Sequence, residues 1–431
     1  MPEMTSEEQM AAYSEAVSSG LYAKRSGLTG KYDNVRKYWE DETTREFLRP
    51  HLRKLIERSK RMMRRVRIMD LGCGSADGYE LLSGIRFRDP DLQVHEVDLL
   101  TGDVLGLYKG VDLNEDLLKQ ARGIYGDSPK LVFEQADFTK GLPNGEGGKP
   151  YDLYFTSFGT FSHHNRDATA IRLLADIAKR VEDYCIVMCD WLGRYSYEWQ
   201  TLWTNDLTKN RNMDYVVSYI YEKEEREARR DELQHIYLRL MSRQEVDHIV
   251  AEASKRAGVE IKPLVFFDRS TFVGRHMDTQ EYNPHAQPIR KAVNSLHEAN
   301  LRTDFSDLII NYVPKPGFDF LNGYFEHLQM CWNALVHHAA WLLEAYDPTQ
   351  ERFARQVSNI PASHPAPLRE MMERMSHVVE GAGWLRVGLP RENVIEPQLG
   401  YALRHLVTGL QQGQGCAHGL VGIFEIDKAA Q

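Results

Sequence analysis

The stretch from Arg67 to Gly78 constrains this chain more than any other part of its sequence. It reads Arg-Ile-Met-Asp-Leu-Gly-Cys-Gly-Ser-Ala-Asp-Gly, which is a short apolar run followed by an acid and closely spaced glycines. This order predicts a buried strand that ends in a sharp turn and opens a helix. Small residues at such a turn allow a ligand to approach the backbone closely. The stretch therefore predicts an α/β protein with a ligand site at this turn.

Two common classes of glycine-rich turn fit the stretch poorly. No Gly-Lys-Ser or Gly-Lys-Thr follows the glycines, which excludes a P-loop. Asp77 stands where dinucleotide-binding turns have a third small residue that lets the helix pack closely. A nicotinamide-dependent oxidoreductase is therefore the less favoured alternative. An acid at this position instead suits a ligand with a cationic end.

The order Asp-x-Gly-x-Gly, formed by Asp70, Gly72 and Gly74, resembles motif I of the class I S-adenosylmethionine-dependent methyltransferases. The resemblance implies a seven-stranded Rossmann-like α/β sheet with helices on both faces, and S-adenosyl-L-methionine as the cofactor. It also implies that the Gly72 and Gly74 backbone lies against the cofactor. Asp70 or Asp77 would then hold the ammonium group of the cofactor, directly or through water.

Two acids compete for the end of the second strand, where this family holds both ribose hydroxyls of the cofactor. A carboxylate suits that role because it accepts two hydrogen bonds at once. Asp98 lies at the more usual distance from the first strand, whereas Asp112, followed by Leu113, better matches the family's Gly-Val-Asp pattern. We favour Asp112 and Leu113, which makes residues 84–106 an insertion or an extra pair of strands.

Two further strand ends extend the resemblance. Residues 131–138 have the form of the third strand, and by resemblance Asp137 accepts from the adenine amino group while the Phe138 amide donates to a ring nitrogen. Residues 151–164 match the fourth strand and the loop after it. Such loops begin where strand carboxyl ends meet the ligand crevice of an open α/β sheet. Ser157 in this loop is therefore expected at the cofactor site.

His163 and His164 end this loop and are the candidate catalytic residues. A neutral imidazole can take a proton from a hydroxyl or an amine as the methyl group arrives. The alternative is a structural role in capping or packing a helix predicted from about 166 to 181. Methyl transfer to a good nucleophile can also proceed through proximity and orientation alone, without a base.

Four residues outside these strand ends are candidates for substrate binding. Tyr32 lies in the amino-terminal part, which forms a lid over the cofactor in many small-molecule methyltransferases. Trp191 opens an aromatic stretch after the fifth strand, where rings suit an apolar or cationic substrate. Arg275 and His276 begin a dense run of hydrogen-bonding groups that suits an anionic substrate or a base. Ordinary packing or salt bridges are the competing explanation for all four.

The chain divides into three predicted parts: a helical amino-terminal lid over 1–60, a methyltransferase core over 61–285 with insertions near 84–106 and 191–240, and a mostly helical carboxy-terminal region over 286–431. Residues 262–267 and 271–275 are expected to close the sheet as a hairpin. Alternatively, the glycine-rich end of the chain returns to the sheet, which makes the helical region an insertion. These helices are expected to cover the active site or to form a homodimer interface.

Composition excludes several other classes of protein. A net charge of −9 argues against nucleic acid as a partner. Five cysteines without metal-type spacing indicate free thiols in a reducing compartment. No signal peptide and no apolar run of membrane-spanning length are visible, so a cytoplasmic protein without a membrane partner or a metal site is expected.

Together these features predict an S-adenosylmethionine-dependent methyltransferase that moves a methyl group to an O, N or C nucleophile of a small molecule, in keeping with specialised metabolism. A catalytically silent S-adenosylmethionine-binding or scaffold protein is the main alternative.

Overall fold

The computed structural model describes residues 14, 17–18, 28, 30–87, 96–143, 149–164, 166–347, 352–353, 360–382, 384–385 and 387–429. Its centre is a nine-stranded sheet whose main path runs in the order β10-β13-β7-β6-β1-β4-β5, with β9 beside β7 and β8 beside β9. The strands are β1 Val66–Leu71, β4 Leu105–Asp112, β5 Leu131–Gln135, β6 Leu153–Phe155, β7 Tyr184–Gly193, β8 Asn212–Val216, β9 His235–Met241, β10 Lys262–Arg269 and β13 Gly419–Asp427. Two short hairpins lie apart from it: β2 Arg86–Phe87 with β3 Val97–Asp98, and β11 Tyr346–Asp347 with β12 Arg352–Phe353.

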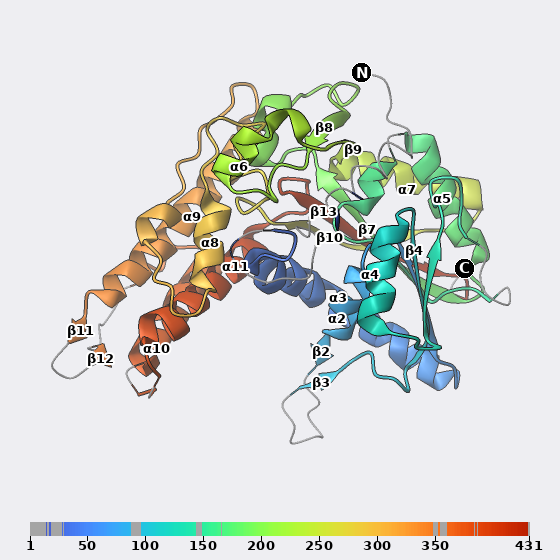
Figure 1. The fold of residues 1–431 in the computed structure, drawn as a ribbon, viewed down its shortest axis with the longest axis horizontal. Helices are drawn as coiled ribbons and strands as arrows, with labels where there is room; N and C mark the ends of the chain where they lie inside the picture. Colours follow the sequence, from blue (N-terminus) through green and yellow to red (C-terminus); the bar gives the residue numbers. More distant parts are fainter. Residues whose placement is uncertain are drawn as a thin grey trace.

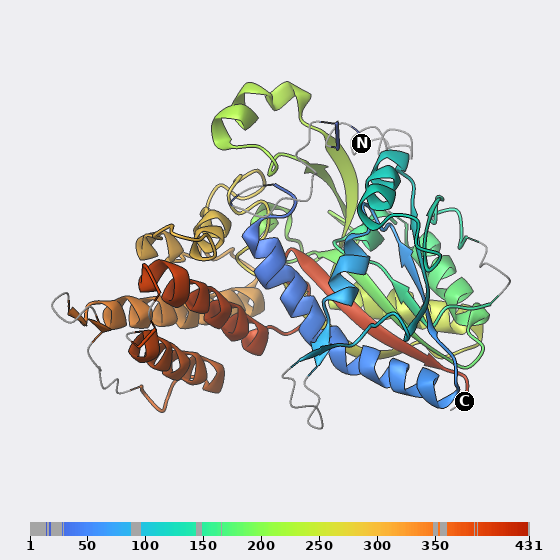
Figure 2. The same ribbon diagram turned by 60° about the horizontal axis from the view of Figure 1, so that its bottom comes forward.

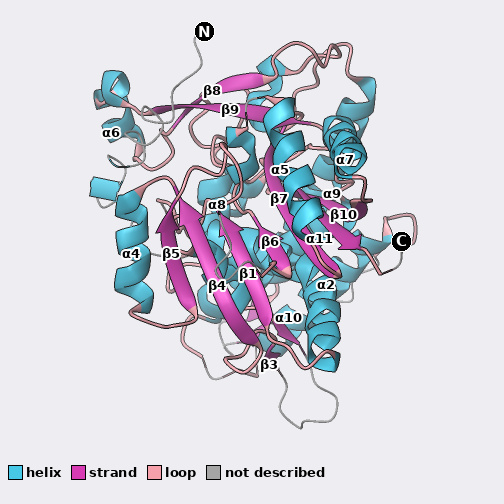
Figure 3. Cartoon of the chain, turned by 90° about the vertical axis from the view of Figure 1, so that its right-hand side faces the viewer, coloured by secondary structure: helices cyan, strands magenta, loops and turns pink. Residues whose placement is uncertain are grey.

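Strand directions identify the fold. From β5 to β7 every neighbouring pair is parallel, and Figure 3 shows β5, β4 and β1 side by side. β13 lies antiparallel between β7 and β10. All ten residues of β7 are buried, as expected for a parallel strand that is covered on both faces. The main path is thus the seven-stranded Rossmann-like sheet of class I methyltransferases, and the predicted fold class is confirmed.

Helices cover both faces of this sheet. Side chains of α5 and α7 pack in one cluster with Met69, whereas side chains of α2, α3 and α4 pack in another with Ile68. Figure 2 shows α2 running beside β13, where Lys54 and Glu425 form an ion pair. The helices are α2 Asp41–Arg61, α3 Asp77–Ser83, α4 Glu115–Tyr125, α5 Asp167–Arg180, α6 Lys223–Ala228, α7 Arg243–Ala257, α8 Ile289–Leu296, α9 Asp319–Leu343, α10 Ala366–Ala382 and α11 Glu396–Leu410. Shorter helical turns are η1 Arg36–Glu40, η3 Thr160–His163, η4 Tyr197–Leu202, η5 Arg230–Glu232, η6 Phe305–Leu308 and η7 Arg391–Ile395.

The predicted closing hairpin is wrong in its second strand. β10 forms as expected, but residues 271–275 are not a strand and the partner of β10 is β13, from the end of the chain. Ser270 and Phe272 have φ values of 68° and 60°, and this left-handed backbone cannot continue an extended strand. The alternative that the glycine-rich end returns to the sheet is therefore the correct one.

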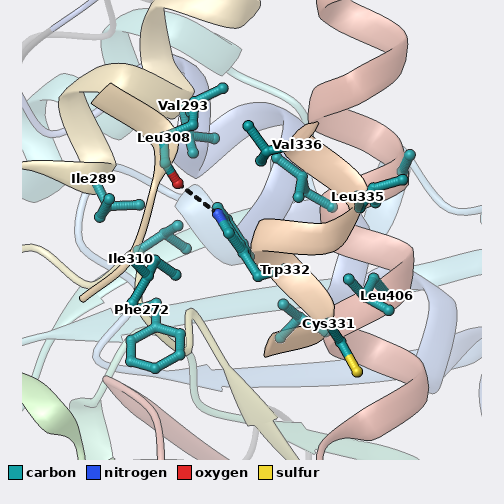
Figure 4. Packing of buried hydrophobic residues seen from close by; sticks show 14 of the residues in the cluster. Phe272, Ile289, Val293, Leu308, Ile310, Cys331, Trp332, Leu335, Val336 and Leu406 are labelled. Carbon is teal, nitrogen blue, oxygen red and sulfur yellow. Dashed lines mark hydrogen bonds between the residues drawn. The ribbon is translucent and has the colours of Figure 1, made fainter. Parts of the chain in front are cut away.

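The helices α8 to α11 lie between β10 and β13 in the sequence and gather to one side of the sheet (Figure 1). They agree with the prediction that residues 286–431 are mostly helical. Trp332 on α9 is fully buried among apolar side chains of this region, and its indole N–H donates to the Leu308 carbonyl at 2.7 Å (Figure 4). The same cluster includes Trp39 and Phe272, so these helices share one core with the segment that precedes α2.

Candidate active site

The turn between β1 and α3 is held against the next strand. The Gly72 and Cys73 amides donate to the Val111 carbonyl at 2.8 and 3.0 Å. Gly72 has φ +74°, and a Cβ at this position would collide with the side chain of Thr160. The turn therefore requires glycine here for two reasons, its backbone conformation and the approach of the loop after β6.

Asp112 stands at the carboxyl end of β4 and faces this turn. Its Oδ2 accepts from the Gly74 amide and its Oδ1 from the Asn114 amide, both at 2.8 Å. Burial raises the pKa of the Asp112 carboxyl, and the two amide donors and Lys31 partly offset that effect. Asp98, the rival residue, is an exposed member of the β2–β3 hairpin and pairs with Arg86 at 3.1 Å.

A cavity opens at the carboxyl ends of β1, β4, β5 and β6, and it is named the Asp112 cavity after its central acid. Eight of the nine residues predicted to bind the cofactor line it: Gly72, Gly74, Asp77, Asp112, Leu113, Asp137, Phe138 and Ser157. Its other lining residues are Lys31, Cys73, Asn114, Leu117, Thr139, Phe158, Thr160 and His163. Sequence positions spread over more than 120 residues thus meet at one site.

Asp70 is the ninth predicted residue, and it does not line this cavity. Its side chain is fully buried and accepts a hydrogen bond from the Tyr108 hydroxyl. A Cβ on Gly78 would collide with it, so Asp70 lies beneath the start of α3. Burial raises the pKa of Asp70 to about 8. This residue supports the turn from below and does not face the cavity.

Asp137 uses its carboxylate mainly to shape its own turn. Its Oδ1 accepts from the Thr139 amide at 3.0 Å, and its Oδ2 pairs with Lys140 at 3.2 Å. Burial opposes ionisation, but the hydroxyl of Thr139, Lys140 and the amide outweigh it and lower the pKa of Asp137. The adjacent Phe138 contributes to the wall of the cavity with its side chain edge-on to His164.

The loop after β6 is anchored from behind by an ion pair. The Phe158 amide donates to Asp190 at 2.6 Å, and Asp190 pairs with Arg269 at the same distance. Both charged side chains are almost completely buried. Phe158 has φ 58°, a left-handed conformation that this anchor holds in place.

Lys31 is one of the cavity residues that no sequence pattern indicated. Its Nζ lies 2.6 Å from Asp77, whose carboxylate also accepts from the Tyr32 hydroxyl. Burial opposes ionisation of Asp77, but Lys31 and Arg36 outweigh it and lower the pKa of this acid. Tyr32, predicted as a substrate contact, thus binds a motif residue. The sequence shows only a lysine followed by an aromatic residue after Gly30, and this pattern is too common to indicate a binding site.

The two candidate catalytic histidines occupy different places. His163 lines the Asp112 cavity, and burial lowers its pKa to about 4. His164 is buried beneath it, packed edge-on between Phe138 and Phe161, and neither ring nitrogen has a hydrogen-bond partner among the described residues. Burial lowers the pKa of His164 to about 3. Only His163 can therefore meet a ligand in this cavity.

We predict that His164→Phe preserves or raises stability. Both ring nitrogens are buried without hydrogen-bond partners in the part of the chain that the structure describes, so a ring of similar shape removes a desolvation cost. The unfolding free energy should then stay equal or rise by about 1 kcal/mol. Below its ordinary pKa the unfolded chain binds a proton on His164 that the folded protein excludes, so folding weakens as the pH falls. Between about pH 7 and 5, the unfolding free energy of the variant should therefore fall less steeply than that of wild type, by up to about 1.4 kcal/mol per pH unit. Urea denaturation measures both effects, and a loss above about 2 kcal/mol at neutral pH would contradict them.

A second and larger cavity, of about 690 Å³, lies on the other side of the segment that carries Lys31; we name it the Arg275 cavity. Its lining residues are Leu28, Gly30, Asp33, Tyr219, Tyr221, Glu222, Lys223, Arg226, Glu227, Arg230, Leu233, Arg275, Asp278, Thr279, Gln280, Glu281, Pro288, Arg290, Lys291 and Asn294. Gly30 and Asp33 face this cavity, whereas Lys31 between them lines the Asp112 cavity. Residues 30–33 therefore form a common wall.

The four predicted substrate residues do not gather at one place. Arg275 lines the Arg275 cavity, where its guanidinium lies over the Tyr219 ring. Trp191 is buried against Phe161, and His276 is fully buried. The His276 ring stacks on that of His418, which is hydrogen-bonded to the buried Glu198 at 3.0 Å. Trp191 and His276 thus lie in the core and line neither cavity.

Among the residues that the structure describes, no group of three histidines, cysteines or acids is placed to hold a metal ion. In the same part of the chain, no helix has the length and apolar character needed to cross a membrane. All five cysteines are described, buried and free of disulfides.

A scan of protein-family models and a search of curated proteins gave no match to this chain. Among solved structures, the chain is similar to an S-adenosylmethionine-dependent methyltransferase from Clostridium acetobutylicum, with 12% identity over 59% of this chain and 90% of that chain and a TM-score of 0.34. It is also similar to CalS10, an amino pentose methyltransferase from Micromonospora echinaspora, with 13% identity over 64% and 96% and a TM-score of 0.31. A third, the DhpI-SAM-HEP complex, has 12% identity over 61% and 94% and a TM-score of 0.37.

Proposed function

We propose that this protein is an S-adenosylmethionine-dependent methyltransferase that transfers a methyl group to an O, N or C nucleophile of a small molecule. One observation carries the proposal: eight residues selected from separate motifs line a single cavity at the carboxyl edge of the sheet. This edge is where open α/β sheets bind their ligands.

The residues present fit the cofactor chemically. The oxygens of Asp112 each hold one backbone amide and keep lone pairs with which to accept from two ribose hydroxyls. Both glycines line the cavity, and a Cβ on Gly74 would meet no other atom closer than 3.8 Å, so a ligand can lie against the turn there. Asp77 and Lys31 supply opposite charges beside it, which suits a zwitterionic amino-acid group.

The cofactor supplies an electrophilic methyl group on a sulfonium centre. The protein's part is to hold the acceptor in line with that group and to exclude water. His163 is the candidate base, because its lowered pKa leaves the ring neutral near pH 7 and able to accept a proton. Asp112 and the glycine turn then serve binding only.

The Arg275 cavity is the proposed acceptor site. Its volume of about 690 Å³ is in the range that holds small molecules, and it shares the wall of residues 30–33 with the Asp112 cavity. Charged side chains of both signs and two tyrosines line it, which favours a polar acceptor. The acceptor atom would have to extend past residues 30–33 into the Asp112 cavity, where His163 and the methyl group would lie.

Calorimetric titration of the purified protein with S-adenosylhomocysteine tests the proposal, with NADH as the control ligand. We expect binding of S-adenosylhomocysteine and none of NADH. Binding of NADH without binding of S-adenosylhomocysteine, or binding of neither ligand, would overturn the proposed function. Turnover of labelled donor with candidate acceptors then distinguishes an enzyme from a silent S-adenosylmethionine-binding protein, which would bind the product and transfer nothing.

A further inference from the structure

The ammonium group of Lys31 lies directly above the glycine turn. Its Nζ is 2.6 Å from Asp77, 3.4 Å from the Ser75 hydroxyl and 3.8 Å from where a Cβ on Gly74 would stand. The Lys31 and Asp77 side chains are only 10% and 8% exposed. A buried cation therefore faces the part of the Asp112 cavity that the glycines leave open.

This position is built into the fold. Arg275 donates to the Lys31 carbonyl at 3.1 Å, and Arg290 binds the carboxylate of Asp33 with two donors at 2.6 and 2.7 Å. Asn294 accepts from the Val35 amide at 2.6 Å. These three residues come from the chain between β10 and β13, so the insertion fixes the segment that carries Lys31.

Two roles for Lys31 follow from its place, and they have opposite consequences. As a plug, Lys31 would occupy the site of the cofactor's ammonium group on Asp77 and would have to leave. As a clamp, it would stay paired with Asp77 and bind the cofactor's carboxylate. Leaving would separate a buried ion pair, which is costly. A lysine ammonium has three donors and can bridge two carboxylates.

We propose that Lys31 binds the carboxylate of the cofactor's amino-acid end while it remains paired with Asp77. The proposal rests on the proposed function and adds a specificity residue to it. Tyr32, which donates to the same Asp77, holds this acid in position for the pair. The chain thereby selects ligands that carry the amino-acid carboxylate over analogues that lack its charge.

The test is a cycle of two proteins and two ligands, measured by calorimetry. The proteins are wild type and Lys31→Met, and the ligands are S-adenosylhomocysteine and its carboxamide, in which the negative charge is removed. We expect wild type to bind the carboxamide about tenfold more weakly than the acid, and Lys31→Met to bind both alike, because a charged hydrogen bond contributes about this much. Lys54→Met, which removes an exposed lysine on α2, should retain the wild-type preference.

The outcomes separate the two roles and the two proposals. Tighter binding of S-adenosylhomocysteine by Lys31→Met would show that Lys31 blocks the ammonium site on Asp77, and it would overturn the proposed contact with the carboxylate. If Lys31→Met binds both ligands more weakly by the same factor, Lys31 only supports the structure of the site, and the proposal is also overturned. If Lys31→Met does not fold, the wild-type protein alone decides: a preference for the acid over the carboxamide of less than about threefold would overturn the proposal. Absence of all binding to wild type would instead overturn the proposed function itself.

Discussion

Asp112→Ala should lower the affinity for S-adenosylhomocysteine by at least about a hundredfold. In the proposed complex this carboxylate accepts two hydrogen bonds from the ribose, and hydrogen bonds to charged groups contribute about 1.5–3 kcal/mol each. The substitution also removes the acceptor for the Gly74 and Asn114 amides, which shape the turn around the ligand. Calorimetric titration measures the loss directly.

Asp98→Ala is the matched control, because Asp98 was the rival for the same role. It is an exposed acid that pairs with Arg86 on a separate hairpin, so its removal should leave the affinity within about twofold of wild type. Loss of binding in Asp98→Ala with retention in Asp112→Ala would reverse the assignment of the ribose ligand.

Arg290→Met should destabilise the fold by about 3–5 kcal/mol at neutral pH. Arg290 is buried and binds Asp33 at 2.6 Å and Glu40 at 2.7 Å, and both acids are buried as well. Removing the cation leaves two carboxylates without their main partner in the interior, which is the costly case for a buried ion pair. Chemical denaturation measures the effect. Arg374→Met, which breaks an exposed pair with Glu370 on α10, should change stability by less than about 0.5 kcal/mol.

The Arg290→Met deficit should shrink as the pH falls from about 7 to 5. In wild type, burial opposes ionisation of Glu40, but Arg290 and three further arginines outweigh it and hold its pKa well below the ordinary value. That stabilisation is present above the unfolded pKa and is lost as the pH falls through the lower folded pKa. Without Arg290, the effect of burial is less fully offset and the pKa of Glu40 rises. On acidification Glu40 is therefore protonated at a higher pH in the variant than in wild type, and this removes part of the cost of the buried charge. A deficit that grows on acidification would contradict this account.

The sequence predicted the parts of the site that depend on local signals. Gly72 and Gly74 mark the turn because glycine is needed where backbone turns sharply, and Asp112 and Asp137 mark strand ends because each follows an apolar run. Parallel strands then bring those ends to one edge of the sheet, so separate motifs meet without further information. α7 has local signals of the same kind, because a capping box of Ser242 and Glu245 begins it and Gly258 in the left-handed conformation ends it.

The parts that the sequence did not reveal depend on long-range contacts. Residues 271–275 are apolar enough for a strand, but β13, nearly 150 residues later, takes the place beside β10. Lys31 reaches Asp77 because Arg275 and Arg290 anchor its segment, and no local pattern encodes that anchor. Trp191 and His276 are of residue types common in binding sites, yet both are buried and line neither cavity.

A crystal structure of the protein grown with S-adenosylhomocysteine would test the central claim most directly. We predict ligand density in the Asp112 cavity, with the ribose hydroxyls on Asp112 and the amino-acid end between Asp77 and Lys31. Density elsewhere on the chain, or a ribose bound by Asp98, would contradict the account.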